Sequence, residues 1–158
     1  MQSKTNITRQ TVDLSSFPDL VVIYLGMKVR SLRGLLTLLS FGPRISAAVA
    51  QKPQGLLLHE PVFFSIFPLH VGMRQYWRDF DSLETWARSL PHQAWWQGFV
   101  KDSGGTGFWH ETYFIRGGME AIYDDMHAAI GFAGFAPVQP AEGAMFSARQ
   151  RLRKQEKI

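Results

Sequence analysis

The chain has 158 residues, of which 46% are hydrophobic and 13% aromatic, and it contains no cysteine. This composition fits one folded domain with a substantial core and excludes disulfides, thiolate metal sites and cysteine nucleophiles. The net charge of +4 comes from residues 149–158, which hold five basic side chains and one acidic one, because 12 basic and 12 acidic side chains remain elsewhere. We therefore expect a flexible basic tail over residues 138–158 and no nucleic-acid-binding face.

The first 18 residues, 1–18, are predicted to form a polar N-terminal arm. They lack the apolar stretch of a signal peptide, and no apolar run in the sequence approaches the roughly 18 residues of a transmembrane helix. The sequence therefore predicts a cytoplasmic protein with no membrane insertion.

Residues 19–29, "DLVVIYLGMKV", predict the first buried strand because β-branched and apolar residues dominate this stretch. A helix is expected over residues 31–50, where four leucines at helical spacing form an apolar stripe: Leu32, Leu35, Leu36 and Leu39. Gly42 and Pro43 should kink this helix or split it in two, since proline cannot donate the helical hydrogen bond.

Two further strands are predicted before the next helix. Residues 56–67 form the first of them, and Pro61 places it at the edge of a sheet or at a bulge. Residues 69–80 form the other strand, in which the alternation of side chains puts His70, Arg74 and Tyr76 on one face. These three polar side chains are therefore expected to share one environment.

The second helical region is expected to begin at Asp81, which together with Glu84 matches a capping box. Pro91 then opens another helical segment, in which a histidine and three aromatic residues follow helical spacing: His92, Trp95, Trp96 and Phe99. A fourth strand is expected over residues 108–116 and a short trailing strand over residues 119–125, followed by an irregular, glycine-rich end.

These elements follow the order β-α-β-β-α-β, which is the ferredoxin-like arrangement of an α+β protein. Helices on one face of a four-stranded antiparallel sheet leave the other face open, and an open face with aromatic and polar residues invites covering by a second copy. We therefore predict a homodimeric α+β-barrel domain over residues 19–137, with a cavity between the sheet and the partner subunit.

Two segments, "MRQYWRDFDSLETWARSLPHQAWW" and "GFWHETYFIRGGMEAIYDDM", carry a family resemblance. From about Asp19 to Pro137 the chain resembles dimeric α+β-barrel proteins and is similar to the bacterial and fungal family named after the fumagillin-pathway monooxygenase. This resemblance implies a dimeric α+β barrel and a monooxygenase. Related barrels also include cofactor-free monooxygenases, haem-degrading enzymes and haem-containing aldoxime dehydratases, so the fold leaves the reaction open.

His110 is the first catalytic candidate, because it lies among aromatic residues and because histidine suits proton transfer or haem ligation. On a regular strand it shares a face with Phe108 and Thr112, which are expected to bind the substrate, whereas Glu111 points to the other face. We expect the face with His110 to line the cavity on the open side of the sheet. The alternative is a buried neutral histidine that is satisfied by its neighbours.

The second catalytic group is the strand face with His70, Arg74 and Tyr76. Histidine could move a proton, arginine could hold an enolate or carboxylate, and tyrosine could donate a hydrogen bond. A hydrated subunit interface is the alternative for this face. His92 is either a packed histidine or, only if haem is bound, its axial ligand. Three further residues are expected to bind the substrate: Tyr24, His59 and Trp95.

No cluster of metal ligands and no nucleophile elbow occurs at the required spacing, so neither a metal site nor a hydrolase triad is predicted. The leading hypothesis is a small monooxygenase that oxidises an aromatic or otherwise hydrophobic small molecule, without a cofactor, in a pocket between the sheet and the partner subunit. One alternative is a haem-binding, dehydratase-like protein of the same fold. The other is a non-enzymatic, dimeric ligand-binding module.

Overall fold

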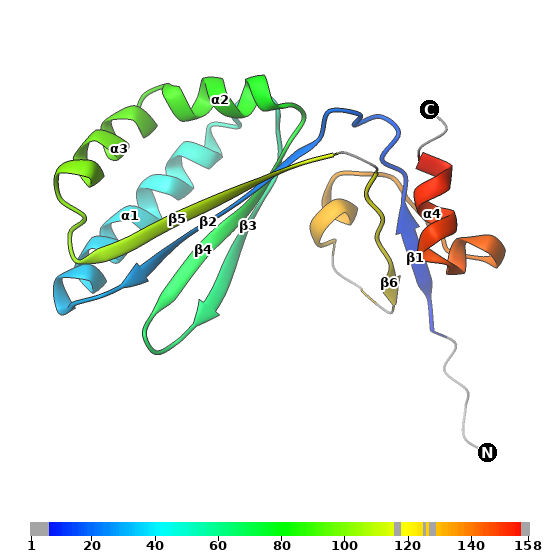
Figure 1. Ribbon diagram of the computed structural model, residues 1–158, viewed down its shortest axis with the longest axis horizontal. Helices are drawn as coiled ribbons and strands as arrows, with labels where there is room; N and C mark the ends of the chain where they lie inside the picture. Colours follow the sequence, from blue (N-terminus) through cyan, green and yellow to red (C-terminus); the bar gives the residue numbers. More distant parts are fainter. Residues whose placement is uncertain (1–6, 116–117, 125, 127–128, 156–158) are drawn as a thin grey trace, which may run out of the picture. The chain divides into compact units, whose positions relative to one another are not determined.

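The computed structural model describes residues 7–115, 118–124, 126 and 129–155 (Figure 1). Its contacts gather into two compact units, one formed by residues 19–114 and the other by residues 1–18 together with 115–158. We call them the sheet unit and the terminal unit.

Four antiparallel strands build the sheet unit, in the spatial order β3-β4-β2-β5. They are β2 (Val21–Val29), β3 (Leu56–Ser65), β4 (His70–Trp77) and β5 (Thr106–Phe114). Helix α1 (Leu32–Ala50) follows β2, and helices α2 (Phe80–Arg88) and α3 (His92–Lys101) lie between β4 and β5 in the chain. The three helices lie on one side of the sheet (Figure 1), which confirms the predicted ferredoxin-like α+β fold.

Strand β3 lies at the edge of the sheet, where Pro61 predicts it. Proline has no N–H group to give to a neighbouring strand, and an edge strand needs partners on one side only. The pairing of β3 with β4 is also interrupted by two register shifts, between Leu56 and Leu58 and between Phe63 and Ser65. Pro61 itself pairs in register with Met73, so of the two alternatives that it indicates, the edge position is the one present at this residue.

Helix α1 turns a different side to the sheet than its leucines predict. Leu32 is 90% exposed and Leu36 is 69% exposed, whereas Gly34 is buried. A Cβ atom at Gly34 would lie 2.2 Å from the carbonyl oxygen of Gly105, so the helix backbone approaches the loop before β5 directly at this point. This close approach turns the leucine stripe away from the sheet. Pro43 lies inside a continuous helix, so the predicted split does not occur.

The N-terminal cap of α2 is Asp79 and not the predicted Asp81. The Asp79 carboxylate accepts a hydrogen bond of 2.7 Å from the backbone N–H of Ser82 and so satisfies a donor at the start of the helix. Glu84, the other half of the predicted capping box, instead pairs with Arg88 one turn later, at 2.7 Å. The cap therefore lies two residues earlier than the pattern indicates.

The core of the sheet unit lies between the sheet and α2. Val21, Trp77 and Leu83 are buried together, and Trp86 packs against Trp77 with ring centroids 5.0 Å apart. The indole N–H of Trp77 donates to the side-chain oxygen of Gln75 at 3.1 Å, and both side chains are fully buried. Packing and a satisfied polar pair thus attach α2 to β4.

The terminal unit contains a second, three-stranded sheet in the order β6-β1-β7. Its strands are β1 (Arg9–Val12), β6 (Tyr123–Asp124) and β7 (Val138–Pro140). Two 3-10 helices, η1 (Gly131–Gly134) and η2 (Gly143–Phe146), and helix α4 (Ala148–Gln155) complete it. Val12, Leu14 and Ala136 form its buried core.

The described parts of the predicted arm and tail thus contain regular structure. Strand β1 lies in the predicted N-terminal arm, and Arg151 of the predicted tail is buried, with its guanidinium 2.7 Å from Glu120 and 2.6 Å from the carbonyl oxygen of Met145. Of the predicted trailing strand, β6 is the part that pairs, with β1, while residue 125 lies outside the described part of the chain. The domain boundary at residue 137 stays a prediction, whereas the contacts divide the chain after residue 114.

The sequence predicts no membrane insertion, and within the described ranges no helix is both long enough and apolar enough to pass through a bilayer.

Candidate functional site

The register of the sheet decides which side chains share a face. Tyr24 of β2 stands opposite Arg74 of β4 and Glu111 of β5, so these three side chains lie on one side of the sheet. The next residue, Leu25, stands opposite His110 of β5, and both lie on the other side. His110 and Glu111 therefore face opposite sides, as the alternation predicts.

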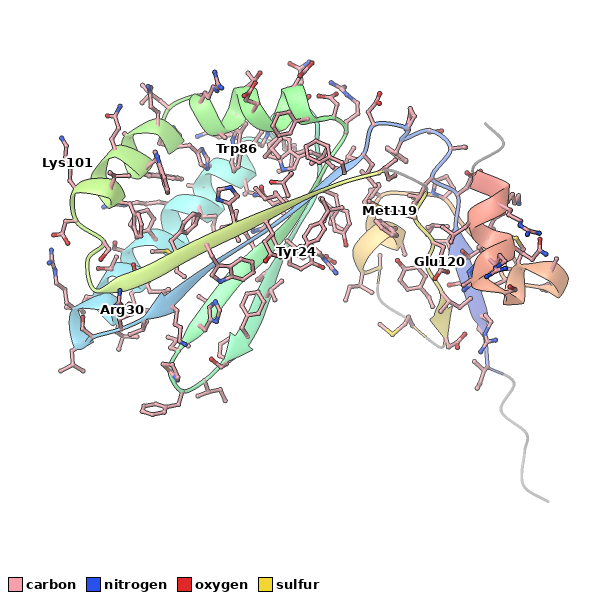
Figure 2. The ribbon with its side chains drawn as sticks, viewed as in Figure 1. Tyr24, Arg30, Trp86, Lys101, Met119 and Glu120 are labelled. Carbon is pink, nitrogen blue, oxygen red and sulfur yellow. The ribbon has the colours of Figure 1, made fainter. Side chains whose placement is uncertain are left out.

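The helices cover the side that carries His110, so the prediction that this face lines the open cavity is wrong. Phe108, two residues before His110 and thus on the same side, contacts Trp96 of α3 with ring centroids 5.9 Å apart. Figure 2 shows Trp86 on this side, below α2, and Tyr24 on the other side of the sheet. We call the two sides the helix-facing side and the open side.

The predicted site residues fall on both sides of the sheet and do not form one site. The helix-facing side receives His110, Phe108, Thr112 and His59, and α3 adds His92 and Trp95 to it. The open side receives His70, Arg74, Tyr76 and Tyr24. A small molecule held on one side is separated from the other set by the sheet itself.

His92 lies at the start of α3 in an aromatic setting. Its ring centroid is 3.7 Å from that of Trp86 and 4.7 Å from that of Trp95, which in turn contacts Phe41 of α1 at 6.1 Å. Burial lowers the pKa of His92 to about 4, so the imidazole is neutral at physiological pH. Its Nδ1 atom is buried and has no hydrogen-bond partner in the part of the chain that the structure describes.

This low pKa makes stability depend on pH. An unfolded histidine takes up its proton near pH 6.5, whereas folded His92 stays neutral down to about pH 4. Between these values the unfolded state binds the proton and the folded state does not, so the free energy of unfolding should fall as the pH falls from about 7 to 4. Urea titrations of wild type and His92→Phe should diverge over this range, and parallel curves would show that His92 is not buried neutral.

The second helix-facing group surrounds Phe108. The Phe108 ring contacts Trp96 at 5.9 Å and Phe99 at 5.7 Å from α3, and it lies 6.0 Å from the ring of His110 in its own strand. His110 is exposed, which excludes the buried histidine that the sequence left as its alternative, and Thr112 beside it is half-buried. The accessible imidazole of His110 therefore lies at the end of a row of aromatic rings, which we call the aromatic wall and which consists of Phe108, Trp96 and Phe99.

His59 is held by a chain of side-chain hydrogen bonds on the same side. The side-chain oxygen of Gln75 accepts from Trp77, so its amide nitrogen is the atom that faces Nδ1 of His59, at 3.1 Å. An amide nitrogen donates, and His59 then carries its proton on Nε2. Burial also lowers the pKa of His59, which fits a neutral, structural histidine. Gln75 has no signal in the sequence pattern that would single it out.

Arg74, on the open side, is already engaged. Its guanidinium lies 2.6 and 2.9 Å from one carboxylate oxygen of Glu60, donates to the hydroxyl of Tyr24 at 3.0 Å, and stands 5.3 Å from the ring centre of Tyr76. Glu60, which the sequence did not suggest, stands opposite Arg74 in the β3–β4 pairing. Because this carboxylate balances the charge of Arg74, the guanidinium is not a free anion-binding group.

A hydrogen-bonded pair of an acid and a tyrosine lies beside this group. The hydroxyl of Tyr113 donates to the carboxylate of Glu111, and the pKa of Tyr113 is raised by that hydrogen bond. The rings of Tyr113 and Tyr24 meet edge to face, with centroids 5.9 Å apart. The open side thus offers aromatic rings and satisfied polar groups, which suits an interface as well as a binding site.

His70 stands apart from Arg74 on the open side. They are four positions apart along β4, which corresponds to about 13 Å in an extended strand. The ring of His70 contacts Trp109 and Phe64, whereas Arg74 contacts Tyr24, Tyr76 and Glu60. The predicted constellation therefore shares a face but forms two separate groups.

One surface pocket is lined by none of the predicted site residues, although Trp86, which contacts His92, is part of its lining. It is lined at the start of α2 by side chains that include Arg78, Asp79 and Ser82. Asp79 and Asp81 both line it. Hydrogen bonds from Ser82 and Arg78 lower the pKa of Asp79 to about 2, so this carboxylate is occupied in capping the helix. We do not regard this pocket as the functional site.

Comparisons with known proteins agree with the fold and name a family. Residues 20–132, well over half of the chain, match the family model described as monooxygenase af470-like. No protein among those with curated functions matches the sequence.

Several solved structures align with this chain at low sequence identity. Two aldoxime dehydratase structures, one of them OxdRE in complex with butyraldoxime, align over 94% of this chain with TM-scores of 0.72 and 0.71 and with 20% and 18% identity. The chain spans 44% of the length of each. SnoaB, a cofactor-independent oxygenase from Streptomyces nogalater, aligns over 62% of this chain and 94% of its own, with a TM-score of 0.49 and 14% identity.

Proposed function

Because the chain belongs to the monooxygenase af470-like family, we propose that it is a small oxygenase acting on an aromatic or otherwise hydrophobic small molecule. The substrate lies on the helix-facing side of the sheet, between α3 and β5, against Phe108 and Trp95. His110 removes a proton from it, and neutral His92 hydrogen-bonds one of its polar groups. This assignment uses the candidate residues on the helix-facing side. Those on the open side are left for another role.

The unpartnered nitrogen of His92 is the observation that carries the proposal. Leaving a buried polar atom without a partner costs roughly 1–3 kcal/mol, and folded proteins contain few such atoms. A bound molecule with a hydroxyl or carbonyl group would supply the missing partner. The rings of Trp86 and Trp95 beside the imidazole favour an aromatic body for that molecule.

The reaction balances without a reductant for a substrate whose CH2 group is made acidic by an adjacent phenol or ketone. His110 takes one proton from the CH2 group, the carbanion gives one electron to O2, and the two radicals combine to form a C–O bond. His110 returns its proton as the hydroperoxide loses water and leaves a carbonyl group. The carbon gives up four electrons and O2 takes up four, with one oxygen atom in the carbonyl and one in water.

The open side is where we propose that a second copy of the chain packs, as the sequence predicts. Its aromatic residues reach solvent, with Tyr113 48% exposed and Phe64 40% exposed. Because Arg74 is neutralised by Glu60, a partner surface could cover it without burying an uncompensated charge. A cavity between the sheet and the partner subunit would then be separate from the oxidation site.

The hydrogen bonding of His92 and His110 does not fit that of an axial haem ligand. An axial histidine usually donates its second ring N–H to a carbonyl or carboxylate group, which orients the ring. Among the described residues, Nδ1 of His92 has no such acceptor, and no hydrogen bond holds the ring of His110. We therefore derive no step through haem, and the alternative is left to a direct spectroscopic test.

Oxygen uptake tests the proposed function. The purified chain, treated with a chelator, should consume one O2 per molecule of an anthrone-type substrate and place one atom of 18O2 in the product carbonyl. Binding of the whole substrate panel without oxygen uptake would favour the ligand-binding module. An absorption band of ligated haem that appears with haemin and disappears in His92→Ala would establish the haem alternative instead.

A further inference from the structure

The open side contains a second histidine group, formed by His70, Trp109 and Phe64, which we call the His70 cluster. The indole N–H of Trp109 donates to Nε2 of His70 over 2.8 Å, across 39 residues of sequence. An indole nitrogen can only donate, so Nε2 is the unprotonated nitrogen and the proton of neutral His70 lies on Nδ1. Within the described residues, Nδ1 has no hydrogen-bond partner, so its N–H is free to bind a ligand.

The cluster is built directly on the strand backbones. The ring of Phe64 stacks on His70 with centroids 4.6 Å apart and an angle of 29° between the planes. A Cβ atom at Gly26 would lie 2.8 Å from Nε1 of Trp109 and 2.9 Å from Nε2 of His70, and one at Gly72 would lie 2.9 Å from Cε2 of Phe64. Two glycines thus provide the space in which three rings lie against the sheet.

Lys28 adds a positive charge next to the His70 cluster. It stands opposite His70 in the β2–β4 pairing and on the same side of the sheet. Burial, and secondly the charge of Lys28, lower the pKa of His70, so the imidazole stays neutral beside the ammonium group. No carboxylate among the described residues pairs with Lys28, which leaves its charge available.

We propose that the His70 cluster and Lys28 bind an arene carboxylate. The Lys28 ammonium pairs with the carboxylate, the Nδ1–H of His70 donates to one of its oxygens, and the aromatic ring packs on Phe64 and Trp109. A charge-assisted hydrogen bond and ring stacking supply the selectivity. The site lies on the open side, so it is independent of the proposed oxidation on the helix-facing side. In a dimer closed through the open side, the second copy would form its remaining wall.

Binding of 2-naphthoate to the full chain, followed by NMR, tests this site. The indole N–H signal of Trp109 and the ring signals of His70 should shift with one common dissociation constant. Neutral 2-naphthamide should bind at least tenfold more weakly. Lys28→Met should weaken naphthoate binding about tenfold or more, as expected for the loss of a hydrogen bond to a charged group, while Lys101→Met leaves it unchanged. Equal affinity for the amide, or an unchanged constant in Lys28→Met, would overturn the proposal.

A second measurement tests the assigned tautomer. Trp109→Phe removes the donor to Nε2 but keeps an aromatic ring, so the pKa of His70 should rise, because protonation of Nε2 no longer displaces a hydrogen bond. The same variant should weaken naphthoate binding, since Nδ1–H is no longer the fixed donor. If the pKa of His70 were the same in Trp109→Phe as in wild type, the hydrogen bond would not orient this ring. That result would contradict the proposed site.

Discussion

His110→Ala is expected to lower the rate of oxygen uptake about 100- to 10,000-fold, the range that removal of a general base produces. His110 is exposed and its ring lies 6.0 Å from Phe108, at the end of the aromatic wall formed with α3. The other two candidate histidines on that side are weaker bases or are engaged, because His92 has a pKa of about 4 and His59 is held by Gln75. The measurement is the turnover rate under saturating substrate, with binding measured separately.

Glu111→Gln is the matched control for this variant. Glu111 is the next residue in the same strand, but it lies on the open side, where it accepts a hydrogen bond from Tyr113. A change there alters the strand and its charge without touching the proposed substrate, so turnover should change less than about threefold. If Glu111→Gln lost as much activity as His110→Ala, or if His110→Ala kept full turnover, the site would not be on the helix-facing side.

Trp77→Ala is expected to lower the free energy of unfolding of the sheet unit by about 3–5 kcal/mol, the usual cost of truncating a buried large aromatic residue. Trp77 is fully buried, packs on Trp86, and donates to the buried oxygen of Gln75. Truncation would leave a cavity under α2 and an unpaired oxygen, which adds to the loss. Urea unfolding monitored by far-UV circular dichroism gives the value.

Two companion variants separate the causes of that loss. Trp77→Phe keeps most of the packing but removes the indole donor, so its effect should lie between those of wild type and Trp77→Ala. Trp96→Ala truncates the same residue type at a position that is 54% exposed, and it should cost less than about 1.5 kcal/mol. Equal destabilisation by Trp77→Ala and Trp96→Ala would contradict the location of the core.

The order of elements could be predicted because the local signals that mark strands survive in the fold. The β-branched run from residue 19 becomes β2, and Pro61 marks an edge strand because a missing N–H is tolerated only there. Alternation along a strand also places His70, Arg74 and Tyr76 on one face before any partner strand is known. These inferences rest on covalent geometry and on interactions within a few residues.

Features that depend on tertiary contacts could not be predicted in the same way. The leucine pattern of α1 indicates a buried stripe, but the close approach of Gly34 to Gly105, 71 residues later, turns that stripe outward. The cap of α2 is decided by which of two aspartates has its carboxylate next to a free N–H, and Asp79 does. Local patterns cannot distinguish these outcomes, because the deciding atoms come from elsewhere in the fold.

The candidate site shows the same division between local and distant interactions. The sequence identifies His92, Trp95 and His110 by residue type and spacing, yet it does not show that they share a side of the sheet that excludes His70 and Arg74. That separation follows from the strand register, in which one residue of shift would exchange the two sides. The partners of the open side, Glu60 and Trp109, become visible only once the strands are paired.

The most direct test of the account is a crystal structure of the protein with a planar aromatic ketone, the product class of the proposed reaction. We predict that the ligand lies between α3 and β5, in contact with Phe108 and Trp95, and that one of its oxygens is within about 3.2 Å of a ring nitrogen of His92 or His110. A ligand found on the open side, with the space beneath α3 filled by protein side chains, would contradict it.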